Sequence, residues 1–201
     1  TLEVGSFVLV SFFIGMLGTN DMAAHNATVN ILHFSFMSAI AIGDGGAIIV
    51  GKYVGSQDWA LAKRTQRALL HLNLIVMMCC GGVFLSLGAE IMGLYLDDPI
   101  PIALGVQLLV VAAVWQIGDA ISISYRFSLR AAGDHTWVMW TGIMLSWFLS
   151  VPSSAVAIWL LEGNVVTVWI CWNIPMYAGA LIFWRRWSSE KWKQKRLVKP
   201  L

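Results

Sequence analysis

The sequence predicts an all-α integral membrane protein, a bundle of six membrane-spanning helices. Of its 201 residues, 58% are hydrophobic and only 12% are charged, and the mean hydropathy is +0.73. A soluble domain typically carries about 25% charged residues, so the surplus of apolar side chains indicates a lipid environment. Two further observations support this class: six apolar segments are long enough, or nearly so, to cross a bilayer, and the basic residues lie on one side of the resulting layout.

The six predicted helices follow one another with short polar connections. A helix rises about 1.5 Å per residue and needs about 20 residues to cross a hydrocarbon layer of about 30 Å. The predicted helices cover about residues 2–17, 23–54, 68–87, 102–125, 136–161 and 165–184. The first is short and the chain opens inside it, so we expect the sequence to start at a cut. Pro152 and Pro175 fall inside the last two helices and are expected to bend them.

All 13 basic residues lie on the same side of this layout. They lie around the second connection, in the fourth, and after the sixth helix: Lys52, Lys63, Arg64, Arg67, Arg126, Arg130, Arg185, Arg186, Lys191, Lys193, Lys195, Arg196 and Lys199. The opposite connections carry Asp21, Asp97, Asp98 and Glu162. The positive-inside rule makes the basic side cytoplasmic. We therefore expect a multi-pass protein of the cell (inner) membrane, with a transmembrane unit at 1–187, a basic cytoplasmic tail at 188–201, and both ends of this segment in the cytoplasm.

Sequence motifs of enzymes and metal sites are absent. There is no HExxH, GxSxG, Walker or GxGxxG pattern, and Cys79, Cys80 and Cys171 lie in apolar runs without ligand spacing. The net charge of +2 gives no indication of a nucleic-acid partner. We expect no cofactor and no catalytic residues, with the lipid bilayer as the main surroundings.

Asp119 is the strongest candidate for a functional residue. An ionisable side chain inside a membrane helix is costly, so its presence indicates a function by default. Gln116 and Ser122 flank Asp119 at i−3 and i+3, which makes one polar stripe on an otherwise apolar helix. Loss of solvation there favours a carboxyl that holds a proton or a cation. The alternative is a structural Asp that hydrogen bonds a neighbouring helix.

Two other carboxylates lie within apolar segments. Glu3 is either a second functional carboxylate or a solvated residue at a helix entrance, and the surrounding sequence leaves both interpretations open. Asp44 lies inside the cytoplasmic end of the second helix, where an aqueous vestibule or a pairing with Lys52 would explain it.

The second helix carries two further patterns. Asn26, Asn30 and His33 share one face, where they either line a cavity or serve as hydrogen-bond partners of the packing. A stripe of small residues at every fourth position predicts close approach to another helix. It consists of Ser35, Ala39, Gly43, Ala47, Gly51 and Gly55.

The order of these features resembles the C-terminal half of a multidrug and toxic compound extrusion (MATE) transporter. The matching stretches are Leu2-Glu3-Val4-Gly5, Ala23-Ala24-His25, Val50-Gly51-Lys52-Tyr53-Val54-Gly55-Ser56, Trp115-Gln116-Ile117-Gly118-Asp119 and Leu129-Arg130-Ala131-Ala132-Gly133-Asp134. Members of that family have twelve helices in two pseudo-symmetric lobes around a central cleft. The resemblance implies that these six helices form one lobe and that an N-terminal six-helix lobe is its partner.

The resemblance also implies a function and its residues. It implies efflux of organic cations or amphiphilic drugs by antiport with Na⁺ or H⁺, with the coupling cation, including any Na⁺, at Glu3 and Asp119. Residues expected to line the cavity or contact substrate are Asn26, Asn30, His33, Trp115, Gln116 and Ser122. The chain departs from the family pattern at Trp115, where many relatives have Phe or Tyr, and at Asp44, where they carry a small or hydroxyl residue. It also departs from it at Leu129-Arg130-Ala131-Ala132-Gly133-Asp134-His135.

Three alternatives remain at this point. A lipid-linked oligosaccharide flippase of the same superfamily would need cationic charge facing its cavity, and the layout places no Lys or Arg in the middle of a helix. A membrane-embedded enzyme would need a nucleophile and a base together, and only His33 and Asp119 are available, on separate helices. A scaffold without transport would not need the polar stripe at Asp119.

Overall fold

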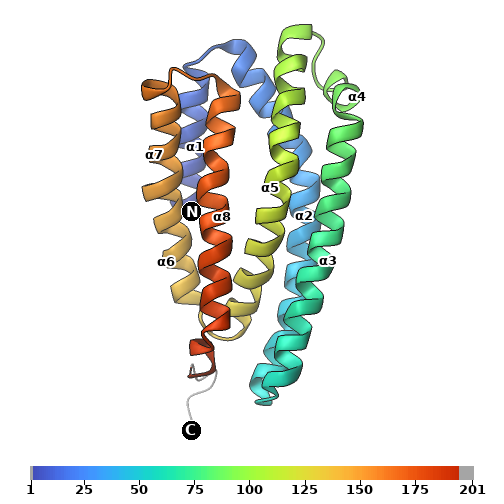
Figure 1. Cartoon of the computed structure of the whole chain (residues 1–201), viewed down its shortest axis with the longest axis vertical. Coiled ribbons are helices and arrows are strands. Elements are labelled where there is room, and N and C mark those ends of the chain that lie inside the picture. Colours follow the sequence, from blue (N-terminus) through green and yellow to red (C-terminus); the bar gives the residue numbers. More distant parts are fainter. Residues whose placement is uncertain (1, 195–201) are drawn as a thin grey trace.

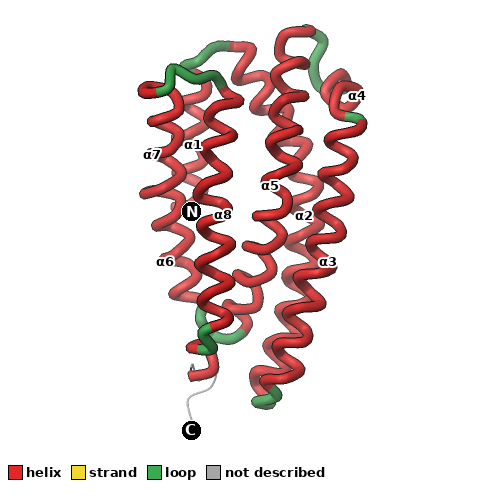
Figure 2. The backbone as a smooth tube through the Cα atoms, in the orientation of Figure 1, coloured by secondary structure: helices red, strands yellow, loops and turns green. Residues whose placement is uncertain are grey.

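The structure is a computed structural model that describes residues 2–194, and those residues form helices and short connections with no β-strand. Helical rods run along the long axis of the molecule, and the connections gather at its two ends (Figures 1 and 2). The rods are built from α1 (Leu2–Gly15), α2 (Thr19–Gly55), α3 (Trp59–Ser86), α5 (Pro99–Ala131), α6 (His135–Leu145) continued by α7 (Val151–Ala155), and α8 (Val165–Ser188), and the short α4 (Gly88–Gly93) follows α3.

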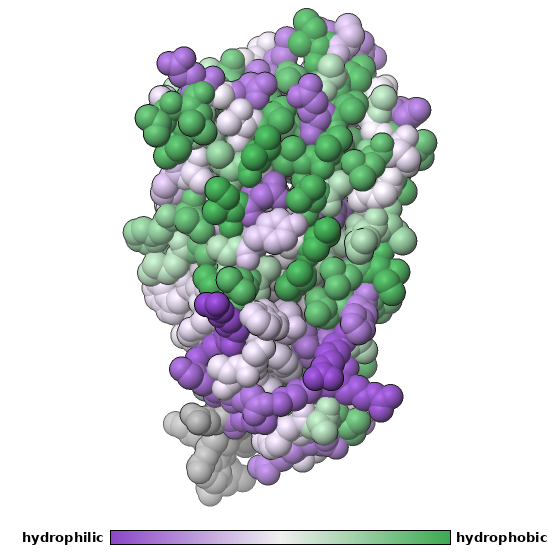
Figure 3. All heavy atoms as spheres, viewed as in Figure 1, coloured by the Kyte–Doolittle hydropathy of each residue, from purple (hydrophilic) through white to green (hydrophobic). Residues whose placement is uncertain are grey.

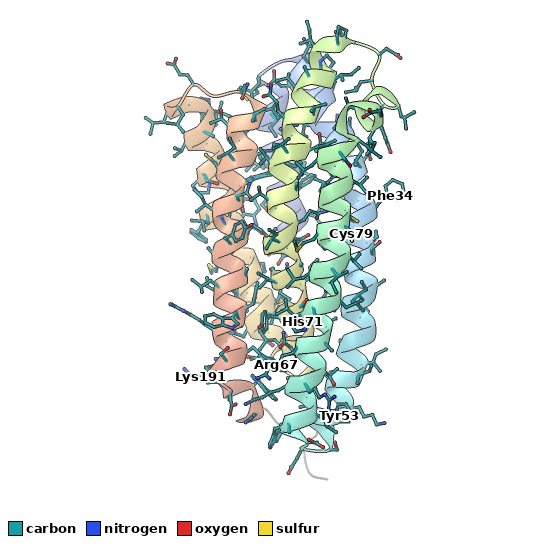
Figure 4. All side chains as sticks on the ribbon, turned by 45° about the vertical axis from the view of Figure 1, so that its right-hand side comes forward. Phe34, Tyr53, Arg67, His71, Cys79 and Lys191 are labelled. Carbon is teal, nitrogen blue, oxygen red and sulfur yellow. The ribbon has the colours of Figure 1, made fainter. Side chains whose placement is uncertain are left out.

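The lengths and exteriors of these rods fit a membrane. Five helical segments within the described residues are long and apolar enough to span a bilayer, and α1 is a shorter apolar helix. Large apolar side chains project outward, among them Phe34, which is 74% exposed and points away from α2 (Figure 4). Hydrophobic residues dominate the middle of the face shown in Figure 3, and polar ones gather towards the lower end. The all-α membrane fold expected from the sequence is therefore confirmed.

The two ends of the bundle differ in charge. The lower end in Figure 1 holds the α2–α3 and α5–α6 connections and the end of α8, and we call it the basic end. Figure 4 labels Arg67 and Lys191 in this lower part of the molecule. The upper end, which we call the acidic end, holds Asp21, whose Oδ1 accepts a hydrogen bond of 3.0 Å from the backbone N–H of Val165.

Helices α3 and α5 extend furthest beyond the apolar runs that predicted them. Helix α3 starts at Trp59, because Asp58 caps it by accepting a hydrogen bond of 3.0 Å from the backbone N–H of Leu61. Helix α5 continues to Ala131, so Arg126 lies within the helix and not in the connection where the sequence placed it. The apolar pattern used for the prediction ends at the first charged residue, whereas the helical backbone hydrogen bonds of α3 and α5 continue past it.

The rod formed by α6 and α7 contains two π-helical turns, at Ser146–Ser150 and Val156–Leu160. Pro152 lacks the N–H that would bond four residues back, and the wider turn before it accommodates this loss. The helix therefore continues past Pro152 through a π-helical turn, and the whole rod spans His135–Leu160.

Helix α5 is the central element, and it packs against α2, α3 and α8. The small residues of α2 allow its close approach: a Cβ built on Gly43 would lie 3.0 Å from the Phe127 ring, and one on Gly51 would lie 3.7 Å from the Ala131 carbonyl oxygen. The small-residue stripe therefore packs against α5 over most of its length, although a Cβ on Gly55 would meet no neighbour within 4 Å.

The residues after α8 do not begin as a free tail. The short 3₁₀ turn Lys191–Gln194 brings Trp192 onto Trp187, with ring centroids 4.4 Å apart and an angle of 11° between the planes. Trp192 is fully buried, and Glu190 forms ion pairs with Lys63 and Lys193. The start of the predicted basic tail is thus docked on α3. Its remaining basic residues, Lys195, Arg196 and Lys199, lie outside the described residues.

Candidate functional site

Asp119 lies on α5 and is buried in the interior of the bundle. Its residue is 8% exposed, and Gln116 and Ser122, one turn to either side, are 1% and 5% exposed. No hydrogen bond joins the Asp119 carboxylate to another residue of the described part of the chain. A carboxylate without such partners is costly at this depth, so the position favours a carboxyl group that binds a proton or a cation.

Glu3 forms an ion pair with Arg126, a residue that the sequence had placed in a loop. Nη2 of Arg126 donates to both Oε1 and Oε2 of Glu3 at 3.1 Å. The two side chains are each about one-third exposed, at 33% for Arg126 and 37% for Glu3. Arg126 follows Asp119 by about two helical turns on the same face of α5. One guanidinium is therefore paired with Glu3 and shares a helix face with Asp119.

The ion pair is held tightly by two residues of neighbouring helices. A Cβ built on Gly142 of α6 would overlap Oε1 of Glu3 and would lie 3.2 Å from Nη2 of Arg126. Phe183 of α8 covers the other side, with the Arg126 Cζ 5.5 Å from its ring centroid. Any side chain at position 142 would therefore require the Glu3 carboxylate to move.

The backbone at Glu3 is also anchored. The Trp147 indole N–H donates to the carbonyl oxygen of Leu2 at 3.0 Å, and the Ser6 hydroxyl donates to the carbonyl oxygen of Glu3 at 2.7 Å. Trp147 belongs to the π-helical turn Ser146–Ser150, so the distortion before Pro152 presents this indole to α1.

A cavity of about 110 Å³ lies beside the ion pair. Helices α1, α5, α6 and α8 and the first π-helical turn supply its lining, which includes Glu3, Arg126, Ser122, Ser146, Trp115 and Trp172. With Ser150 as a further lining residue, its walls combine an acid, a base, three hydroxyls and two indoles. Such a lining suits small ligands that carry charge and aromatic surface.

An aromatic cluster adjoins the cavity. Trp115, Trp169 and Trp172 contact one another pairwise, with ring centroids 5.7 to 5.9 Å apart and the rings tilted or edge-to-face. Trp169 in turn contacts His25, which is 1% exposed. Trp115 thus lines this cavity and also packs against the aromatic core of the lobe.

The residues predicted to line a cavity from α2 lie elsewhere. Asn26, Asn30 and His33 are exposed on the side of α2 that faces away from the rest of the bundle, and Asp44 continues the same face. The structure does not bring them together with Asp119 or with the cavity at Trp115 and Ser122. Gln116 is buried beside Asp119 without lining that cavity.

Sequence reasoning missed Arg126 and Gly142. Arg126 carried a usable signal, because it follows Asp119 at i+7 and a helix extended by two turns would place both on one face. Gly142 carried none, since only the contact between α6 and α1 explains why a side chain is excluded there.

Fold and site together define a multi-pass membrane protein with a buried carboxyl group near a small, partly charged cavity. The chain belongs to the MATE family, whose model, MatE, matches residues 1–156. Members of this family are transporters and not enzymes.

Individual relatives match almost the whole chain. It is 28% identical to the probable multidrug resistance protein NorM of Pseudomonas putida, over 98% of this chain and 43% of that protein. It is 26% identical to the protein of the same name from Mannheimia succiniciproducens, over 99% of this chain and 44% of that protein. Among solved structures, MATE in complex with MaD3S superposes with a TM-score of 0.87 at 16% identity, over the whole chain and 46% of that structure. The chain thus spans less than half the length of these relatives.

Proposed function

We propose that this chain is one lobe of a secondary active efflux transporter that exports organic cations or amphiphilic drugs by antiport with Na⁺ or H⁺. Membership in the MATE family and the multidrug resistance names of the two relatives support this class. The observation that carries the proposal is Asp119, a buried carboxyl group without a hydrogen bond to the described residues, held inside a membrane-spanning helix near a cavity.

The coupling follows from the cost of that carboxylate. Placing a bare charge at membrane depth costs roughly 2.5–3.5 kcal/mol or more. A cation that arrives from outside and neutralises Asp119 removes this penalty and changes which conformation is favoured. Substrate release and cation entry are then opposite phases of one cycle.

The polar face of α2 supports a partner lobe. Asn26, Asn30, His33 and Asp44 would be expensive in contact with lipid chains, yet all four are exposed in this lobe. The relatives that match are about twice as long as this chain. We therefore assign this face to the cleft against an N-terminal six-helix lobe. By the positive-inside rule the basic end then lies in the cytoplasm, with the protein in the cell (inner) membrane.

One observation favours a second candidate, a lipid-linked oligosaccharide flippase of the same superfamily. Such a protein needs cationic charge in its cavity, and Arg126 lines the cavity that the sequence left without a base. Glu3 neutralises Arg126, however, so the cavity presents no excess of positive charge. Drug efflux therefore remains the first choice.

The test is drug efflux from membrane vesicles that contain the product of the complete gene, driven by an imposed Na⁺ or H⁺ gradient. We expect Asp119→Asn to abolish gradient-driven efflux. Glu90→Gln, which removes an exposed carboxylate on α4, should leave it unchanged. Efflux by Asp119→Asn at the rate of the unmodified protein would overturn the proposal.

A further inference from the structure

The charged groups near the cavity form a set of three. Glu3 and Arg126 line the cavity and pair with each other, and Asp119 lies about two turns from Arg126 on the same face of α5. Two carboxylates and one guanidinium leave a single net negative charge. The set therefore has room for one monovalent cation from outside, and not for two.

Arg126 already occupies one of these carboxylates. Its Nη2 donates to both carboxylate oxygens of Glu3 at 3.1 Å. It thus takes the position that a bound cation would take between these two oxygens. Gly142 and Phe183 confine the pair, so the contact is built into the packing of two other helices, α6 and α8.

The position of Arg126 gives it a second partner. A guanidinium released from Glu3 would be attracted to Asp119, since both side chains rise from the same face of α5. A cation that arrives at Glu3 would free Arg126 for Asp119, and a cation at Asp119 would favour Arg126 at Glu3. The occupancies of the two carboxylates therefore exclude each other.

We propose that Arg126 is a resident counterion that competes with the external cation for Glu3, so that the site binds one monovalent cation at a time. This inference rests on the proposed function, in which the site takes up a coupling cation. Arg126 is thus a residue that sets the stoichiometry of coupling.

The expected size of the effect follows from the exposure of the pair. Glu3 and Arg126 are each about one-third exposed, so solvent screens their attraction. An exposed ion pair changes a binding equilibrium by up to about fivefold. Removal of the Arg126 charge should therefore tighten Na⁺ binding at Glu3 by up to about fivefold.

The experiment counts cations bound by the purified product of the complete gene in the absence of drug. Equilibrium binding of radiolabelled Na⁺ and proton uptake after a pH change are measured side by side. We expect one cation per molecule for the unmodified protein and for Arg126→Lys. Arg126→Gln should bind two, and the double variant Glu3→Gln/Arg126→Gln should return to one.

Gly142→Ala supplies a test that keeps every charge in place. The added methyl group displaces the Glu3 carboxylate from Arg126, so a second cation should bind at a lower concentration than in the unmodified protein. If Arg126→Gln and Gly142→Ala both bind one cation with unchanged affinity, the inference is wrong. That result leaves the transport proposal intact as long as Asp119→Asn still abolishes efflux, whereas an unmodified protein that binds neither cation would overturn both.

Discussion

Trp169 donates its indole N–H to Nδ1 of His25 across 3.2 Å and thereby ties α8 to α2 inside the lobe. Because Nδ1 accepts, the ring proton lies on Nε2, which is 3.1 Å from the hydroxyl oxygen of Ser11 on α1. His25 is thus a neutral ring that joins three helices. Because His25 is almost completely buried, its Nδ1 has no water to bond, and the Trp169 indole satisfies it.

Replacement of Trp169 by Phe should lower stability, because it leaves Nδ1 of His25 buried without a donor. The expected loss is about 1–3 kcal/mol, the cost of an unsatisfied buried polar group. Thermal unfolding of the detergent-solubilised protein measures it. Trp140→Phe is the control, since Trp140 is 51% exposed. Equal stability of the two variants would show that the hydrogen bond does not hold these helices together.

Gly43 and Gly45, two residues apart on α2, should respond in opposite ways to substitution by Ala. A Cβ on Gly43 would lie 3.0 Å from the Phe127 ring and 3.3 Å from Ile123, whereas one on Gly45 meets nothing within 4 Å. Overpacking costs about 1–3 kcal/mol, and Ala gains up to about 1 kcal/mol over Gly in a helix. We expect Gly43→Ala to lower the thermal stability and Gly45→Ala to preserve or raise it. Stabilisation by both would mean that α2 and α5 can separate at no cost.

Arg186 should be essential for the connection between α5 and α6. Its Nε donates to Oδ2 of Asp134 at 2.6 Å, and Asp134 is 1% exposed. The guanidinium also lies over the Trp137 ring, with 4.8 Å between Cζ and the ring centroid. Removal of one partner of a buried ion pair typically costs about 3–5 kcal/mol.

We therefore expect Arg186→Gln to lower the thermal stability strongly. Arg185→Gln, at the exposed neighbouring position, should change it little. The comparison removes one positive charge from the same turn in both variants, so a similar loss would assign the effect to net charge and not to the contact with Asp134.

Trp192 should anchor the basic end of α8 to α3. It stacks on Trp187, meets the edge of Trp59 and donates its indole N–H to the Trp187 carbonyl oxygen at 2.8 Å. Burial of a whole indole makes Trp192→Ala costly, by about 3–5 kcal/mol. Limited proteolysis is expected to cut the variant after α8 faster than the unmodified protein. Trp184→Ala, where the side chain is 45% exposed, should be cut at the original rate.

The positions of the helices were largely predictable, because a membrane helix must satisfy its backbone internally and present apolar side chains to lipid. Each long apolar run therefore became one rod. The helix ends were less predictable. Arg126 continues α5 because its charge is paired with Glu3, and a rule that stops a helix at the first charge does not include such partners.

The candidate site was predictable only along single helices. The i±3 spacing of Gln116, Asp119 and Ser122 placed them on one face, and the structure buries all three. The same reasoning grouped Asn26, Asn30 and His33 correctly as one face of α2 but could not say where that face points. In the lobe it points outward.

The sequence by itself determined an all-helical membrane lobe, its six apolar segments and the polar stripe around Asp119 on α5. These features depend on hydrophobicity and on the period of one helix. Only the tertiary structure decided that Arg126 meets Glu3, that Gly142 makes room for the pair, and that His25 lies between Trp169 and Ser11. These contacts join residues from different helices. Their formation depends on how the helices are rotated and spaced against one another, and no periodicity within a single helix records that.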